Sequence, residues 1–179
     1  GCENSILSDS CYSTISGGYC NCITDSSYNS TIGGGCCNSI NGAEAATISG
    51  GYKNCITDSS MYSTIGGGTE NTISSDSSCS TISGGYCNSI NGAEAATISG
   101  GYENCISGGS CSFIMGGKNN LLTHNCSAIA GTDITSRATS SLHVNNILLE
   151  TGSIPTADPG IPGMLFIAGG ALKVSGCIA

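Results

Sequence analysis

Isoleucine recurs with a strict spacing in a chain that is otherwise rich in small polar residues. The repeated pattern is Thr-Ile-x-Gly-Gly-x-x-Asn-x-Ile, and successive copies lie 16 or 17 residues apart. The first isoleucine of each copy is Ile15, Ile32, Ile48, Ile65, Ile82, Ile98 and Ile114. The second is Ile23, Ile40, Ile56, Ile73, Ile90 and Ile106, followed by Leu122. A period this short, with glycine corners between β-branched segments, predicts one coil of a parallel β-solenoid per copy.

Alternation along a strand predicts which side chains face the interior. Each isoleucine is expected to point inward and its two neighbours outward. The Gly-Gly pair is expected to turn the corner, because glycine tolerates positive φ. One asparagine recurs in each copy, and amides stacked in register can hydrogen-bond along the axis. These asparagines are Asn4, Asn21, Asn38, Asn54, Asn71, Asn88, Asn104 and Asn120. The rest of each copy, such as residues 24–29 or 41–46, is expected to be a freely variable loop.

The repeat covers residues 1–131, which we predict to be a solenoid domain of about eight coils. Residues 132–179 are predicted to form a C-terminal capping and trimerisation segment. Within it, residues 140–149 alternate like a strand, and residues 157–163 form a turn-rich connector. Residues 164–175 predict a β-hairpin around Gly169-Gly170, with Ile167 opposite Leu172 and Leu165 opposite Val174.

The composition argues against two classes of protein, nucleic-acid-binding proteins and proteins with a membrane-spanning helix. The net charge is −8 with only 4 Lys and Arg residues, which argues against a sequence-independent grip on nucleic acid. No apolar run reaches the roughly 20 residues that a membrane helix needs. No signal peptide is evident, and the opening half-repeat indicates a fragment of a longer chain.

The 13 cysteines follow the repeat rather than a disulfide or zinc pattern. Cys22, Cys55 and Cys105 share a position that holds Ser or Thr in other copies, which favours free thiols over a disulfide framework. Cys20 and Cys37 are the exception, because they occupy the same position in adjacent coils and could come within bonding distance.

Whole coils have been duplicated within the chain. Residues 37–56 and 87–106 differ only at Lys53 and Glu103, a pattern that a one-dimensional stack tolerates. The same register places Lys53 beside Glu70 on the next coil, so we expect an ion pair there.

The string Ser-Thr-Ile-Ser-Gly-Gly-Tyr-x-Asn, followed by a small-residue loop and another Ser-Thr-Ile, resembles the head repeats of trimeric autotransporter adhesins. It is more similar still to coil repeats in tail-fibre and surface-fibre proteins of bacteriophages and other viruses. The resemblance covers residues 1–131. It implies a left-handed parallel β-roll in which three chains lie side by side as a spacer or adhesive shaft. Association is also expected because two isoleucines bury little apolar area relative to the entropy lost by ordering a coil.

Candidate chemistry is sparse. His124 is expected on a solvated loop, and His143 beside a strand is expected to be an interface residue rather than a base. Asp25, Asp58, Glu44 and Glu94 are repeated surface carboxylates rather than an acid–base pair, with weak calcium binding as an alternative. We therefore predict no catalytic, cofactor-binding or metal-binding residue.

The resulting hypothesis is a non-enzymatic, homotrimeric attachment fibre on a virion or cell surface, binding a host receptor or glycan without inserting into the membrane. A bacterial trimeric surface adhesin is the near alternative. A second alternative is ice binding through an outward ladder of threonines, Thr14, Thr31, Thr47, Thr64, Thr81 and Thr97. A companion column two residues further on, Ser16, Ser49, Ser83 and Ser99, is interrupted at Gly33 and Gly66.

Overall fold

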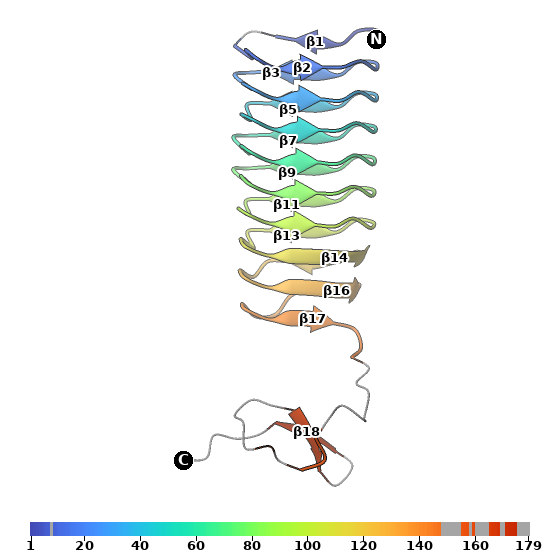
Figure 1. The fold of residues 1–179 in the computed structure, drawn as a ribbon, viewed down its shortest axis with the longest axis vertical. Helices are drawn as coiled ribbons and strands as arrows, with labels where there is room; N and C mark the ends of the chain where they lie inside the picture. Colours follow the sequence, from blue (N-terminus) through green and yellow to red (C-terminus); the bar gives the residue numbers. More distant parts are fainter. Residues whose placement is uncertain (8, 148–154, 158, 160–164, 169–170, 175–179) are drawn as a thin grey trace. The chain divides into compact units, whose positions relative to one another are not determined.

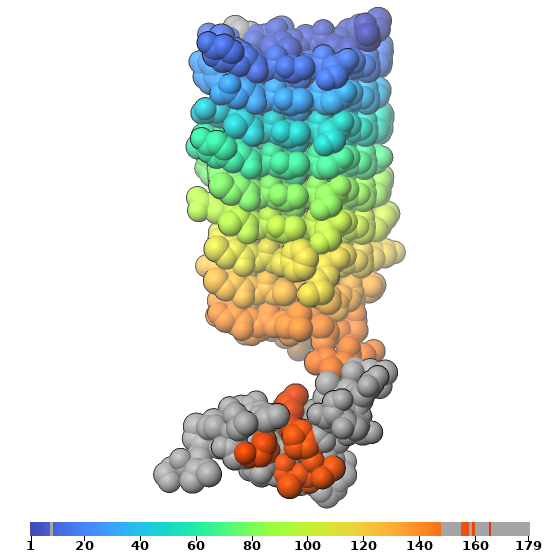
Figure 2. Space-filling view, in the orientation of Figure 1, coloured from blue at the N-terminus to red at the C-terminus, as the bar shows by residue number. Residues whose placement is uncertain are grey.

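The computed structural model describes residues 1–7, 9–147, 155–157, 159, 165–168 and 171–174, and the account below concerns these residues. The chain divides into two compact units, residues 1–145 and 146–179. The first unit is an all-β parallel solenoid, as predicted, and none of the described residues is helical. Its coils stack as tiers of nearly constant width (Figures 1 and 2).

Each coil except the last contributes one strand to each of two parallel sheets, and the last contributes a strand to the second sheet only. The first sheet contains β1 (Ser5–Ile6), β3 (Cys22–Thr24), β5 (Ser39–Asn41), β7 (Cys55–Thr57), β9 (Thr72–Ser74), β11 (Ser89–Asn91), β13 (Cys105–Ser107) and β15 (Leu121–Leu122). The second contains β2 (Thr14–Ile15), β4 (Thr31–Ile32), β6 (Thr47–Ile48), β8 (Thr64–Ile65), β10 (Thr81–Ile82), β12 (Thr97–Ile98), β14 (Phe113–Lys118), β16 (Ala128–Thr132) and β17 (Leu142–Val144). Neighbouring strands are one coil apart in sequence and pair isoleucine with isoleucine.

The isoleucines form two continuous inward columns, as predicted. Each one from Ile23 to Ile114 is fully buried, whereas the residues on either side of it are half-buried or exposed. Because the strands are in register, each isoleucine packs on its counterparts in the coils before and after it.

The segment expected to be a free loop is instead part of the core. Ser27 and Ser30 are fully buried, and so are Ala43 and Ala46 at the same two positions of the next coil. The Ser30 hydroxyl donates to the carbonyl of Ala43 (2.9 Å) and accepts from the backbone N–H of Ala46 (3.0 Å). Both positions hold a small residue in these two coils, and serine links consecutive coils through its hydroxyl. The expectation of a free loop was therefore wrong, because Ser27 in residues 24–29 and Ala43 and Ala46 in residues 41–46 point into the core.

The stack contains about nine turns, one more than the repeat count predicts. The added strand β17 pairs in parallel with β16, placing His143 opposite Ile129 in the inward column. The parallel pairing thus extends past residue 131, although the sequence repeat does not. Ile147, at the end of the predicted strand 140–149, is exposed outside β17, and residues 148–149 lie outside the described residues.

In the second unit, β18 (Leu165–Ala168) pairs antiparallel with β19 (Ala171–Val174). Leu165 lies opposite Val174 and Ile167 opposite Leu172, so the predicted hairpin register is confirmed. The predicted turn at Gly169-Gly170 and most of the connector 157–163 lie outside the described residues.

Candidate functional site

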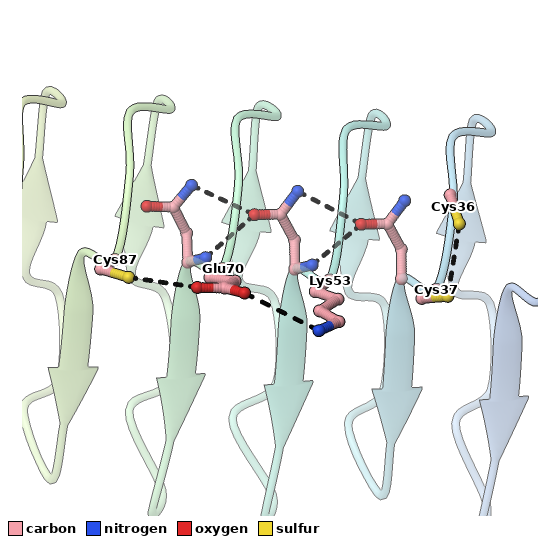
Figure 3. A network of polar contacts seen from close by, with 8 residues as sticks. Cys36, Cys37, Lys53, Glu70 and Cys87 are labelled. Atoms are coloured by element: carbon pink, nitrogen blue, oxygen red, sulfur yellow. Dashed lines mark hydrogen bonds and ion pairs between the residues drawn. The ribbon is translucent and has the colours of Figure 1, made fainter.

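A buried asparagine ladder holds the Gly-Gly corners of successive coils together. The Asn71 Oδ1 accepts from the backbone N–H of Asn88 (3.0 Å) and from its Nδ2 (3.1 Å). The Asn71 Nδ2 in turn lies 3.0 Å from the carbonyl oxygens of Gly67 and Gly85. The same contacts recur from Asn21 to Asn120, and Figure 3 shows a row of these amides. The predicted axial ladder is confirmed, and its polar groups are satisfied within the protein.

The ladder explains why the second glycine of each corner has no side chain. Gly85 has a φ of 95°, and a methyl group there would overlap the carbonyl oxygen of Gly101 on the next coil. Gly84 meets no such obstacle, because a methyl group there would be 3.8 Å from the nearest atom, the oxygen of Gly67.

A variable column, which we call the charge column, lies one residue before each of the eight ladder asparagines and continues at Asp133, which precedes Ile134. It consists of Glu3, Cys20, Cys37, Lys53, Glu70, Cys87, Glu103, Asn119 and Asp133. All nine residues have positive φ, between 52° and 58°, so every coil makes the same left-handed turn. From Cys20 onward, the backbone N–H of each donates to the coil before it, for example Glu70 to the carbonyl of Tyr52 (2.9 Å). Identical backbone geometry therefore stacks chemically different side chains along one line.

Neighbours on the charge column interact along the axis. Lys53 Nζ lies 3.8 Å from Glu70 Oε1, which confirms the predicted ion pair, although both side chains are solvent-accessible. Glu70 Oε2 also accepts a hydrogen bond from the Cys87 thiol at 3.4 Å (Figure 3). At the first coils the Cys20 thiol donates to Glu3 Oε2 at 3.0 Å, and this hydrogen bond lowers the pKa of Glu3.

An aromatic column, which we call the tyrosine column, runs beside the charge column. It contains Cys2, Tyr19, Cys36, Tyr52, Thr69, Tyr86, Tyr102 and Lys118, linked by parallel bridges. Its four tyrosines are 39–46% exposed, and the Tyr86 and Tyr102 rings stack with centroids 5.2 Å apart. Lys53 and Lys118 lie over the Tyr52 and Tyr102 rings at 5.0 and 5.2 Å. This column was not predicted from the sequence, although a tyrosine lies four residues after the first isoleucine in four copies and was a usable signal.

Hydrogen bonding to neighbouring thiols raises the pKa of two tyrosines in the tyrosine column. The hydrogen bond to Cys87 raises the pKa of Tyr86 to about 12, and the bond to Cys20 does the same for Tyr19. In both cases a nearby thiolate at alkaline pH favours the protonated phenol, which can donate to it.

The threonine column lies on the outer face of the second sheet. Thr14, Thr31, Thr47, Thr64, Thr81 and Thr97 are paired residue for residue along successive strands. The column ends where Phe113 pairs with Thr97 and Ala128 pairs with Phe113. The in-register ladder is therefore present over six coils, as the sequence suggested.

The cysteines are free thiols in the part of the chain that the structure describes, and Cys177 lies outside it. Cys55 and Cys105 are half-buried in the first sheet, and burial raises the pKa of both thiols. Within the described residues, no three or more His, Cys, Asp or Glu side chains are placed to hold a metal ion.

The two histidines lie on different segments at the end of the stack. His124 lies in the loop between β15 and β16, as expected, but it is half-buried, and its Nδ1 lies 2.8 Å from the Ser136 hydroxyl. His143 lies in β17, and with Asp133 and Arg137 it lines an open depression at the end of the stack. Its Nε2 is 3.4 Å from the carbonyl of Ala138, whereas Asp133 accepts from Asn119 Nδ2 (2.9 Å). These contacts do not form the nucleophile–base pair that covalent catalysis requires.

Three of the four carboxylates expected on the surface are exposed. Asp25, Asp58 and Glu94 are exposed, and Glu44 is half-buried.

No protein-family model matches this chain, and no curated protein sequence matches it. No helix among the described residues has the length and apolar character needed to cross a membrane.

Proposed function

We propose that this chain is a non-catalytic shaft or attachment segment of a viral or phage fibre. The observation that carries the proposal is the unbroken axial bonding of the first unit. Every described coil is joined to the next by paired strands, and most are also joined by a buried asparagine amide. Such a stack is suited to holding a binding element at a distance, because load along its axis is shared among many parallel hydrogen bonds.

Attachment would occur through the side chains that vary from coil to coil. The charge and tyrosine columns present carboxylates, thiols, lysines and half-exposed aromatic rings along one edge. Repeated weak contacts of this kind add up when a receptor or surface glycan is itself repetitive. Labelled full-length chain on a glycan array tests this role, and binding that requires Tyr86 and Tyr102 supports it. An absence of binding to any glycan or host-cell surface contradicts it.

We further propose a left-handed coil and a homotrimer. The support is the resemblance of the repeat together with the apolar surface that one stack leaves in solvent. Tyr12 is 88% exposed and Tyr62 is 60% exposed, and both lie at one corner position of their coils. Side-by-side association would remove such rings from water. Native mass spectrometry of the full chain should give three times the chain mass, and a monomer at micromolar concentration contradicts the proposal.

A bacterial trimeric surface adhesin shares every feature above and differs in location. Immunogold labelling with an antibody against the charge column separates the two. Labelled virus particles support the fibre, whereas label confined to bacterial cell surfaces supports the adhesin.

Ice binding has its own supporting observation, the threonine column. Its hydroxyl and methyl groups repeat at the strand spacing of about 4.8 Å over six coils. If this column binds ice, Thr64→Tyr should abolish thermal hysteresis, whereas Thr72→Tyr on the opposite sheet should preserve it. An absence of hysteresis in the unmodified protein excludes this alternative.

A further inference from the structure

Two thiols of the charge column are stacked directly on each other. Cys20 and Cys37 have nearly the same backbone conformation, with φ of 52° and 58°. The N–H of Cys37 donates to the carbonyl of Tyr19 at 2.9 Å, which fixes residue 37 one coil above residue 20. In-register parallel strands lie about 4.8 Å apart. That separation is within the Cα–Cα range of disulfides, about 4.4–6.8 Å.

A third thiol lies beside this pair. The Cys36 and Cys37 sulfurs are 3.3 Å apart (Figure 3), and the hydrogen bond between these two thiols raises the pKa of Cys37. A hydrogen bond between Cys20 and Cys37 acts to lower the pKa of Cys37. The sulfur of Cys37 therefore has two candidate partners, one in its own coil and one in the preceding coil.

Covalent geometry decides between the two partners. Cys36 and Cys37 are consecutive residues, and Cα atoms across a trans peptide are only about 3.8 Å apart, which is shorter than disulfides normally allow. Cys20 and Cys37, one coil apart in register, meet the Cα criterion. We propose that Cys20 and Cys37 are an oxidation site at which a low-molecular-weight disulfide, such as oxidised glutathione, introduces a covalent staple between adjacent coils.

The reaction is two successive thiol–disulfide exchanges. One thiolate attacks the small disulfide, forming a mixed disulfide and releasing one small thiolate, which takes up a proton. The second protein thiolate then attacks the protein sulfur of the mixed disulfide and releases the other small thiolate. In total, two protein thiols lose two hydrogens and two electrons, and one small disulfide is reduced to two small thiols.

The chain contains its own matched control at Cys87. This residue occupies the same column with the same φ of 52°, and its thiol contacts Glu70 at 3.4 Å. The charge-column residues on either side of it are Glu70 and Glu103, so no thiol lies above or below it in that column. Cys87 should therefore stop at the mixed disulfide under conditions in which Cys20 and Cys37 cross-link.

The experiment uses the full chain, reduced and then incubated with oxidised glutathione. Free thiols are alkylated, the protein is digested with chymotrypsin without reduction, and the peptides are analysed by mass spectrometry. Cleavage after Tyr19 and Tyr28 places Cys20 and Cys37 on different peptides. We expect a cross-linked peptide pair lighter by two hydrogen atoms and a glutathione adduct on Cys87.

Single Cys→Ser variants identify which two cysteines form the cross-link. The cross-link should disappear in Cys20→Ser and in Cys37→Ser and persist in Cys36→Ser. A link between Cys36 and Cys37 would overturn the proposal, as would glutathione adducts on Cys20 and Cys37 matching that on Cys87. Loss of the link in Cys36→Ser, or a link that persists in Cys20→Ser, would also overturn the assignment.

Discussion

The asparagine ladder and the charge column lie one residue apart along the chain, yet they differ in almost every respect. The ladder repeats the same residue in eight coils, whereas the charge column holds Glu, Cys, Lys, Asn or Asp. The backbone is equally regular at both positions, so local conformation does not account for the contrast. The ladder side chain points inward, where its amide must both donate and accept, and the charge-column side chain points to solvent. Buried hydrogen-bond demand fixes residue identity in this fold, and regular geometry alone does not.

The largest expected effect comes from breaking the ladder. Asn71→Ala removes the acceptor of two Asn88 donors and the donor to two glycine carbonyls. Leaving such groups buried without partners should lower the free energy of unfolding by about 3–5 kcal/mol. Urea denaturation with hydrogen exchange should locate the loss in the coils around residue 71.

The adjacent charge-column residue provides the control. Glu70→Ala removes an exposed ion pair and a long thiol hydrogen bond, so only a small loss is expected. Equal destabilisation by the two variants would refute the contrast between the columns.

The second-largest effect is expected at the Gly-Gly corner, which the asparagine ladder joins to the next coil. Gly85→Ala forces a methyl group against the Gly101 carbonyl at positive φ, and should cost about 2–4 kcal/mol. Gly84→Ala should be nearly neutral or slightly stabilising, because its site is open. Thermal unfolding of the pair is the measurement, and the same shift in both variants would contradict close packing of the corners.

A smaller effect is expected at the buried serines. Ser80 donates to the carbonyl of Ala93 (2.9 Å) and accepts from the N–H of Ala96 (3.0 Å). Ser80→Ala should therefore cost about 1–2 kcal/mol in urea unfolding. The outward Ser83→Ala in the same coil should cost less, because Ser83 is exposed. If Ser83→Ala cost as much, the hydroxyl of Ser80 would not be linking coils.

The smallest expected effect concerns the pKa of Tyr86, which lies beside Cys87 of the charge column. Cys87→Ser removes the thiol whose hydrogen bond raises the pKa of Tyr86 to about 12, so the phenol should ionise at lower pH. A raised phenol pKa favours the folded state below the unfolded value near 10, and this contribution is lost as pH rises through 12. Ultraviolet difference titration of Cys87→Ser against Cys79→Ser, which lies on another exposed corner, measures the shift. An unchanged titration would mean that the two side chains do not interact.

The features that were predictable are those in which one residue type repeats with the coil. The isoleucine columns, the asparagine ladder and the Lys53–Glu70 pair all follow from periodicity and parallel register. The buried serine and alanine columns were not predicted, because Ser and Ala are equally common in exposed loops. Their inward direction depends on the left-handed turns between them, such as the one at Asn29. The last coil was missed because β17 carries His143 where other coils carry isoleucine.

Parallel pairing of near-identical coils also makes the length of the stack adjustable in fixed steps. Duplicating one 16- or 17-residue unit moves everything beyond it by about 4.8 Å and leaves the existing contacts unchanged. A gene that gains or loses such units therefore changes the length of the protein in equal steps. Natural selection can adjust that length without changing the residues of the core.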